Sequence, residues 1–315
     1  MNPVRSARPK RRRAKAAAAV VALATALGAG TLASSASAAP YPSSPPKNMH
    51  GLKHPFVSPD LLARDASGKV WRIGSVQDAS GKNFTAAEAP VPEGGGWNAY
   101  DRIEMVGDIT PDGYPDAVAR DRDGVLWKYT AKSASYAGSF WTRTRIGAGW
   151  NTYTMFTGGS DVRYDLHPDL VAVDKRGDLY LYEGSDGTGE RTYLPRRKIG
   201  HGWGVYDRIT AVGNIGGGIE GDLVARDKAG VLWLYLGKPG GTFAPRTRIG
   251  GGWNAYGDII GIGDADGDWR NDLYAYGPDG TGYLYRGNGE WKAPFENRVA
   301  NTTLKDSGIK ASLVF

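Results

Sequence analysis

Residues 222–233 have the sequence DLVARDKAGVLW, and close copies of this stretch recur through the chain. Residues 60–71 are DLLARDASGKVW, residues 116–127 are DAVARDRDGVLW, and residues 169–180 are DLVAVDKRGDLY. A shorter copy, DLYAYGPDG, starts at Asp272, so the leading aspartates are 56, 53, 53 and 50 residues apart. A period close to 50 residues indicates a propeller or another repeat array.

Each repeat unit contains four short runs with the composition of β-strands. In the fourth unit these are residues 206–212, 223–226, 231–235 and 243–249, with Gly-containing turns between them. Four such strands in about 50 residues predict one blade of an all-β propeller. The aspartates that precede the x-x-Gly turns are predicted turn formers: Asp65, Asp121, Asp174 and Asp227.

The number of blades depends on how the ring closes. The first unit lacks a strand upstream of residue 60, whereas the chain ends in an extra strand-like segment, GIKASLVF, at 308–315. If this C-terminal strand completes the first blade, residues 56–315 form a closed five-bladed β-propeller of four-stranded blades without exposed sheet edges. The alternative is an incomplete or open array.

The N-terminal segment has the features of a secretory signal. Residues 1–38 contain seven basic and no acidic residues, so the remaining chain carries 6 − 7 = −1 of the net charge of +6. An apolar run at 16–33 and the small residues at 36–38 predict a signal peptide of residues 1–38, with a transmembrane anchor as the alternative. A Pro/Ser-rich arm spans residues 39–55.

These features predict a secreted, extracellular monomer with no membrane span after signal removal. Because the excess positive charge lies in the leader, we expect no nucleic-acid partner. The chain contains no cysteine, so its core alone has to stabilise it outside the cell.

The loop before the last repeat copy is rich in carboxylates. Asp264, Asp266, Asp268 and Asp272 occupy positions 1, 3, 5 and 9 of nine residues, and the backbone carbonyl of Arg270 lies at position 7. Four neighbouring carboxylates repel one another, and a hard divalent cation with six to eight oxygen ligands removes that repulsion. The spacing predicts a Ca²⁺ site, with a solvated acidic turn as the alternative.

The loop before the second copy keeps most of this pattern. Asp108, Asp112 and Asp116 occupy positions 1, 5 and 9, Thr110 lies at position 3, and Tyr114 would supply the carbonyl at position 7. The sequence therefore predicts one or two Ca²⁺ ions per chain.

The acidic loops resemble the FG-GAP repeat, also called VCBS, of integrin-type β-propellers. The resemblance is carried by DGYPD at 112–116 and GDADGD at 263–268, and it covers essentially everything after residue 56. It implies Ca²⁺ in the loop between the first two strands of a blade, on one face of the ring. This chain departs from the family in having five predicted blades and in the loops 161–169 and 214–222, which have lost ligands. We expect these two loops to be turns held by side-chain-to-backbone hydrogen bonds.

A second repeated element, Gly-Trp-x-x-Tyr, links each blade to the next. It resembles the repeats of tachylectin-2-like five-bladed sugar-binding propellers, and Trp faces stack on sugar rings. The predicted carbohydrate-binding residues are Trp97, Asn98, Tyr100, Trp150, Asn151, Tyr153, Trp203, Tyr206, Trp253, Asn254 and Tyr256. Alternatively, the Trp rings pack between blades and leave Asn98, Asn151 and Asn254 to line a pocket.

The common catalytic motifs are missing from the sequence. It contains no Gly-x-Ser-x-Gly, no His-Glu-x-x-His and no phosphate-binding loop, so we expect no enzymatic activity. The predicted function is that of a secreted, Ca²⁺-stabilised binding module for carbohydrate or cell-wall glycan. The alternative is an interaction platform for, or an inhibitor of, an exported protein.

Overall fold

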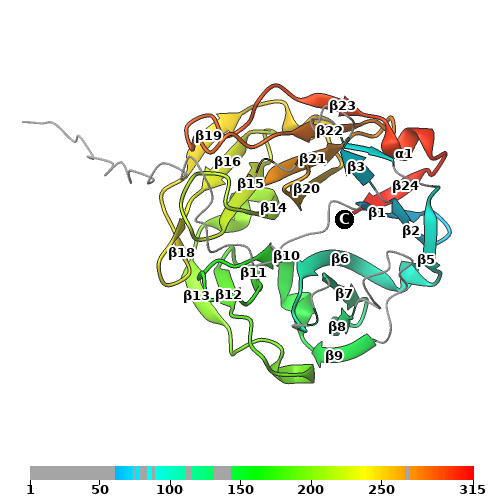
Figure 1. The fold of residues 1–315 in the computed structure, drawn as a ribbon. Helices are drawn as coiled ribbons and strands as arrows, with labels where there is room; N and C mark the ends of the chain where they lie inside the picture. Colours follow the sequence, from blue (N-terminus) through cyan, green and yellow to red (C-terminus); the bar gives the residue numbers. More distant parts are fainter. Residues whose placement is uncertain are drawn as a thin grey trace, which may run out of the picture. The chain divides into compact units, whose positions relative to one another are not determined.

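The computed structural model describes residues 61–73, 75–77, 84–86, 89–110, 112, 115–130, 143–266, 268 and 270–315, all within one compact unit. The predicted signal peptide and the arm at 39–55 lie outside the described residues. Five four-stranded antiparallel sheets follow one another around a ring, as the change of colour along the chain shows (Figure 1). The predicted five-bladed β-propeller is confirmed.

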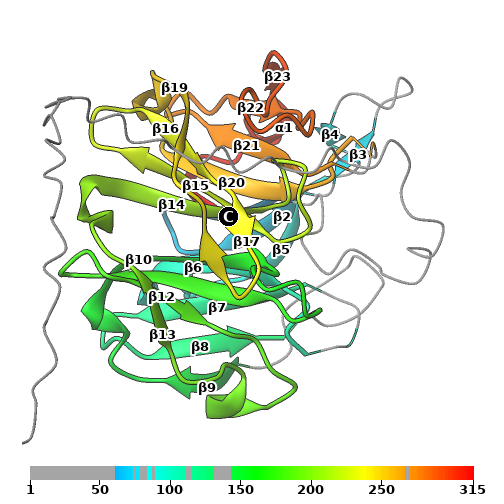
Figure 2. The ribbon, with the colours of Figure 1, turned by 90° about the vertical axis from the view of Figure 1, so that its left-hand side faces the viewer.

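In each blade the first strand lies nearest the centre of the ring and the last lies at the rim (Figure 1). Figure 2 shows strands of the second blade side by side in this order. From centre to rim, the strands are β24 (Ala311–Val314), β1 (Leu61–Asp65), β2 (Val70–Ile73) and β5 (Val91–Gly94) in the first blade; β6 (Tyr100–Gly107), β7 (Asp116–Asp121), β8 (Leu126–Tyr129) and β9 (Arg143–Gly147) in the second; β10 (Tyr153–Ser160), β11 (Asp169–Asp174), β12 (Leu179–Tyr182) and β13 (Arg197–Gly200) in the third; β14 (Tyr206–Gly213), β15 (Asp222–Asp227), β16 (Leu232–Tyr235) and β19 (Thr247–Gly250) in the fourth; and β20 (Asp258–Gly263), β21 (Asp272–Tyr276), β22 (Gly282–Tyr285) and β23 (Val299–Asn301) in the fifth.

Short elements decorate the connections between these strands. The hairpins β3 (Ser75–Gln77) with β4 (Phe84–Ala86) and β17 (Gly237–Lys238) with β18 (Thr242–Phe243) lie between the third and fourth strands of their blades. The one-turn helix α1 (Thr303–Asp306) precedes β24.

The C-terminal strand closes the ring. β24 pairs with β1, and the two backbone hydrogen bonds between Leu62 and Phe315 are 3.0 and 2.9 Å long. The Val314 N–H also donates to the Asp258 carboxylate in the fifth blade at 3.0 Å. In Figure 1 the red C-terminal strand accordingly lies beside the blue β1. Residues from both ends of the described chain therefore share the first blade, as the sequence predicts.

The hydrophobic core lies between the blades. Each of five buried clusters combines residues from two successive blades. In one of them, Val118 and Leu126 of the second blade meet Phe156 and Leu170 of the third. Because each blade buries its faces only against its neighbours, the stability of the fold depends on a closed ring.

The Asp-x-x-Gly turns between second and third strands have the predicted construction. In the fourth blade Asp227 Oδ1 accepts the N–H groups of Ala229 and Val231, each at 3.0 Å, and Oδ2 accepts the Trp233 indole N–H at 2.9 Å. The same backbone pattern recurs at Asp65, Asp121 and Asp174.

Candidate functional site

The acidic loops leave the inner strands at a β-bulge. Gly263 ends β20 with a φ of 73°, and the register with β21 shifts between Gly261 and Gly263. Gly107 and Gly213 hold φ values of 75° and 62° at the equivalent places, and in the third blade Gly159, one position earlier, has a φ of 89°. This left-handed conformation favours glycine, and the bulge turns the chain out of the sheet ladder so that the loop can form.

The last aspartate of each loop ties the loop to the blade. Asp272 is fully buried; its Oδ2 accepts the Ala265 N–H and its Oδ1 accepts the Gly287 N–H, both at 2.9 Å. Asp169 and Asp222 make equivalent bonds in the third and fourth blades. The last aspartate therefore has a structural role, because it holds the loop to the blade whether or not the loop has a full set of carboxylates. The ligand assignment from the sequence missed this role.

The fifth-blade loop gathers its remaining carboxylates. Asp264, Asp266 and Asp268 each offer one oxygen, and these oxygens lie within 4.8 Å of one another, the one such set of three among the described residues. Burial, with the charge of neighbouring carboxylates, raises the pKa values of Asp266 and Asp268 and raises the pKa of Asp272 to about 8. Oxygen donors that repel one another at this spacing suit a hard divalent cation such as Ca²⁺.

Two arginines flank this cluster at a distance. Arg286 Nη1 lies 3.9 Å from Asp266 Oδ2, and Arg270 Nη1 lies 3.8 Å from Asp268 Oδ2. Arg286 makes its shorter contact, 2.9 Å, with Glu296. The two arginines therefore offset only part of the negative charge. The backbone carbonyl of Arg270 stays a predicted ligand.

The second-blade loop is arranged differently. The Thr110 hydroxyl donates to Asp116 Oδ2 at 2.7 Å, and Asp108 Oδ1 accepts the N–H groups of Thr110 at 3.3 Å and of Asp112 at 3.2 Å. Thr110 replaces the carboxylate at position 3, so this loop lacks the set at positions 1, 3 and 5 that converges in the fifth blade, and the Thr110 hydroxyl lies 3.4 Å from Asp112 Oδ2. The predicted carbonyl ligand of Tyr114 lies outside the described residues.

A buried lysine lies beside this second loop. Lys128 on β8 is 3% exposed, at a position where the third, fourth and fifth blades have leucine. Burial lowers its pKa, while the charges of Asp116 and Asp112 act in the opposite direction. Our sequence interpretation missed this residue, although comparing LWKY at 126–129 with LWLY at 232–235 reveals it.

The third-blade loop is held by its own side chains. Asp161 Oδ1 accepts the Asp165 N–H at 3.0 Å, and Oδ2 accepts the Leu166 N–H at 2.7 Å. Arg163 forms ion pairs with Asp165 at 3.0 Å and with Glu183 at 2.9 Å. In the fourth blade, Asn214 plays the organising role and accepts the Gly217 N–H at 2.9 Å. Both loops thus contain the side-chain-to-backbone bonds expected from the sequence.

The Trp rings of the repeated turns are buried between blades. Trp97, Trp150, Trp203 and Trp253 begin the 3-10 helices η2 (Trp97–Ala99), η3 (Trp150–Thr152), η5 (Trp203–Val205) and η6 (Trp253–Ala255), and they are only 4–6% exposed. Each Trp backbone N–H donates at 2.9 Å to the glycine carbonyl of the preceding blade's Asp-x-x-Gly turn. The turns therefore dock one blade onto the next.

Tyrosines and an arginine complete each Trp cluster. In the third blade Trp150 stacks on Tyr182 with 4.8 Å between ring centroids, and the Tyr182 hydroxyl meets the Tyr153 hydroxyl at 2.5 Å. Arg196 donates to Tyr153 Oη at 2.5 Å and covers the Tyr180 ring. The other predicted tyrosines, Tyr100, Tyr206 and Tyr256, are buried in the same way. Of the two interpretations left open by the sequence, packing between blades describes these rings.

The asparagines are the exposed members of the predicted carbohydrate-binding set. Asn98 Nδ2 donates to the Ala66 carbonyl at 3.2 Å, and Asn151 Nδ2 reaches the Arg122 carbonyl at 3.5 Å. Asn254 occupies the same place in the turn between the fourth and fifth blades and is exposed. The third-to-fourth blade turn has Gly204 instead.

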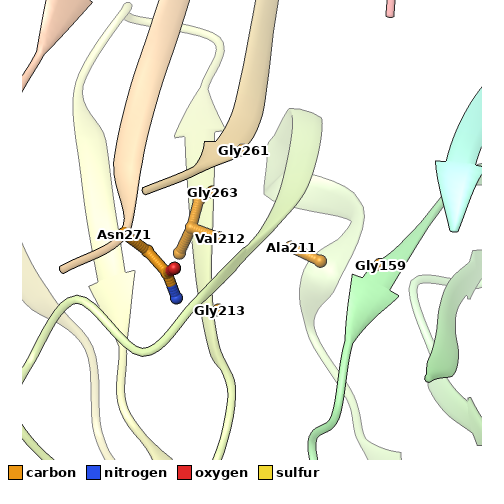
Figure 3. A pocket seen from close by; sticks show the side chains of 7 residues that line it. All are labelled: Gly159, Ala211, Val212, Gly213, Gly261, Gly263 and Asn271. Atoms are coloured by element: carbon orange, nitrogen blue, oxygen red, sulfur yellow. The ribbon is translucent and has the colours of Figure 1, made fainter. Parts of the chain in front are cut away.

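A shallow depression lies where the inner strands of three blades end (Figure 3). Backbone and small side chains line it, including Gly159 of the third blade, Gly213 of the fourth and Gly263 of the fifth. Asn271 points into the same region, and a Cβ on Gly213 would lie 1.9 Å from its Nδ2 atom. The depression adjoins the Asp264 loop, but no charged side chain lines it.

No protein-family model matches the sequence, and no curated protein matches it. Among solved structures, BBS1N in complex with ARL6DN, soaked with mercury, is 9% identical, with a TM-score of 0.34 over 77% of this chain and 63% of that chain. Human WBSCR16 is 11% identical, with a TM-score of 0.33 over 74% of this chain and 63% of that chain. The chain thus spans less than two thirds of either structure, and these similarities carry no argument about function.

Within the part of the chain that the structure describes, no helix is long and apolar enough to cross a membrane.

Proposed function

We propose that this chain is an exported, non-enzymatic binding module that holds a protein partner on one face of the ring, with Ca²⁺ stabilising the fifth-blade loop. The ring itself supports a binding or interaction platform, because its loops present a broad, repeated surface on a rigid scaffold. The role that we propose is one without catalysis, because the sequence lacks the common catalytic motifs.

The observation that carries the protein partner is the placement of exposed apolar side chains. Val205, which is 50% exposed, lies in η5 on the opposite face, whereas Tyr164, Leu166, Leu194 and Ile219 are 46%, 56%, 44% and 59% exposed. All four lie in loops that join first to second or third to fourth strands of the third and fourth blades. In an antiparallel blade these loops emerge on the same face, which is the face of the acidic loops. Exposed apolar groups gathered on one face are typical of protein interaction sites.

The backbone supports this assignment. Tyr164 and Leu166 hold φ values of 57° and 73°, in the left-handed region that bulky residues avoid. Such strain costs about 1–3 kcal/mol per residue and clusters at functional sites. The hydrogen bonds to Asp161 hold the strained loop and keep both side chains at the surface.

The partner proposal is tested by comparing the parent with Tyr164→Ser/Leu166→Ser/Ile219→Ser. Both immobilised proteins are exposed to the exported proteins of the producing cells, and bound material is identified after cross-linking. The parent is expected to retain a protein that the triple variant loses, while the two melting curves agree. Equal retention by both proteins, or no retention by the parent, contradicts the proposal.

Glycan binding is the second candidate, and the three exposed asparagines favour it. Asn98, Asn151 and Asn254 repeat at equivalent places around the other face, so several weak sites would act together. A glycan array separates the two candidates. If glycans bind, Asn98→Ala/Asn254→Ala is expected to lose retention with little change in the melting temperature.

The Ca²⁺ proposal rests on the Asp264, Asp266 and Asp268 oxygens, which lie within 4.8 Å of one another. An ion there would also lower the pKa values of the neighbouring carboxyl groups and hold the loop ionised at neutral pH. We propose that the role of the ion is structural. The buried Asp272 links this loop, through the Ala265 N–H, to the segment after β22, through the Gly287 N–H.

A further inference from the structure

One position in the third strand differs between blades. Leu181, Leu234 and Leu284 are 0%, 0% and 2% exposed in the third, fourth and fifth blades, and Lys128 takes their place in the second. Each of these residues pairs with the second-strand residue two places after the last aspartate of the acidic loop. The substitution therefore puts a long cationic side chain at a core position next to an acidic loop.

The register places Lys128 on the same face of the sheet as the loop's last carboxylate. Lys128 pairs with Val118, and Asp116 precedes Val118 by two residues, so Asp116 and Lys128 are diagonal neighbours. A lysine side chain can span that separation. Asp116 is 0% exposed, so both charges are withdrawn from water. A buried ammonium needs a nearby carboxylate to offset its desolvation, and a buried carboxylate needs a cation or donors.

We infer that Lys128 is the built-in cation of the second-blade loop and replaces Ca²⁺ there, so that the chain binds one Ca²⁺ ion, in the fifth blade. The two loops differ as this inference requires. Leu284 brings no charge to the fifth blade, and Asp264, Asp266 and Asp268 crowd together. In the second blade Thr110 stands in place of the position-3 carboxylate, and its hydroxyl donates to Asp116 at 2.7 Å and lies 3.4 Å from Asp112 Oδ2. A divalent ion beside Lys128 would be repelled by the ammonium.

The expected count of one ion rests on the proposed Ca²⁺ site of the fifth blade. The experiment below tests that site and the role of Lys128 separately. Native mass spectrometry of chelated and then CaCl₂-treated protein counts the bound ions directly. Lys128→Met removes the charge and keeps an unbranched chain of similar length. We expect one ion on the parent and two on Lys128→Met. Adding Asp112→Asn to Lys128→Met is expected to return the count to one.

A fifth-blade variant makes the two claims independent. Asp266→Ala/Asp268→Ala is expected to bind no ion, and adding Lys128→Met is expected to restore one. If the parent binds none but Lys128→Met binds one, the fifth-blade site is wrong and the lysine inference holds. If the parent binds two, or if Lys128→Met never gains an ion, the lysine inference is overturned.

Melting curves add a readout that does not count ions. In chelator, Lys128→Met is expected to melt below the parent, because Asp116 loses its counter-charge, and CaCl₂ is expected to raise its melting temperature more than it raises that of the parent. Lys128→Leu, which copies the third, fourth and fifth blades, is the second variant in case the methionine packs poorly; the first blade has Arg72 at this position. Leu234→Met is the matched packing control and is expected to leave the ion count and the Ca²⁺ response unchanged. An equal Ca²⁺ response in the parent and both Lys128 variants contradicts the inference.

Discussion

Arg226, on the second strand of the fourth blade, donates a hydrogen bond of 2.7 Å from Nη1 to the carbonyl oxygen of Tyr256, at the entrance to the fifth blade. The same nitrogen reaches the Trp253 carbonyl at 3.1 Å. Arg64 and Arg120 make the equivalent pairs of bonds from the first and second blades. The Ala-Arg-Asp part of the repeat therefore clamps one blade to the next.

Arg226→Ala is expected to destabilise the ring. The carbonyls of Trp253 and Tyr256 lose a charged donor. A hydrogen bond to a charged group is worth about 1.5–3 kcal/mol. We expect the free energy of unfolding, measured in urea, to fall by at least the value of one such bond. Lys228→Ala, an exposed change in the adjoining turn, is the control and is expected to leave the unfolding curve unchanged. If Arg226→Ala and Lys228→Ala give identical urea unfolding curves, Arg226 does not hold the two blades together.

Trp203→Ala tests whether the repeated Trp residues are structural. The ring is 6% exposed and stacks near Tyr235 with 4.3 Å between centroids. Removing a buried Trp costs about 3–5 kcal/mol, and we expect a loss of that order in chemical denaturation. A variant that unfolds like the parent would show that the ring is free to bind a ligand.

Asp222 predicts a pH dependence of stability. Burial raises its pKa to about 7 despite three N–H donors, from Ile215, Gly216 and Gly237. The folded form therefore holds a proton that the unfolded chain, with a usual Asp pKa of about 3.9, gives up. The contribution is largest below the unfolded pKa and is lost as pH rises towards 7.

We expect the parent to lose stability between pH 4 and pH 7 from this group, measured by urea unfolding at matched ionic strength. Asp222→Asn is expected to flatten that part of the profile while lowering stability overall, because its amide nitrogen cannot accept a hydrogen bond. Parallel profiles for parent and variant would assign the dependence to other groups.

Deleting residues 308–315 tests ring closure. The truncation removes β24 and leaves the edge of β1 unpaired. An unpaired strand edge makes a protein prone to aggregation. We expect loss of the cooperative melt or elution as aggregates in size-exclusion chromatography. A monomer with the parent's melting curve would contradict five-bladed closure.

The repeat fixed much of this architecture in advance. The spacing of the leading aspartates predicts the blade count, and the surplus strand at the C-terminus predicts how the ring closes, because both follow from local sequence patterns. Side-chain roles across blades were harder to predict. The Trp rings have the composition of a sugar platform, and only the docking of each turn onto the preceding blade shows that they are buried.

The arginines show the same limit. Arg143, Arg196 and Arg246 are exposed at or just before the outermost strand of their blades, yet each also donates to the buried hydroxyl of a tyrosine at the start of the inner strand of the same blade. Lys128 was visible in the sequence as a departure from leucine. Its meaning required the strand register, which places it diagonal to Asp116.

The central claim is that the acidic loop of the fifth blade is stabilised by Ca²⁺, and differential scanning calorimetry with and without chelator tests it most directly. An ion that binds only the folded chain adds about 2.7 kcal/mol at a hundredfold excess over Kd. For a domain of this size, that corresponds to a rise of several degrees, at about 2–4 °C per kcal/mol. We expect Ca²⁺ to produce this rise, Mg²⁺ to substitute poorly, Asp266→Ala/Asp268→Ala to abolish it and Asp165→Ala to retain it. A parent melting temperature that chelation leaves unchanged would contradict the claim.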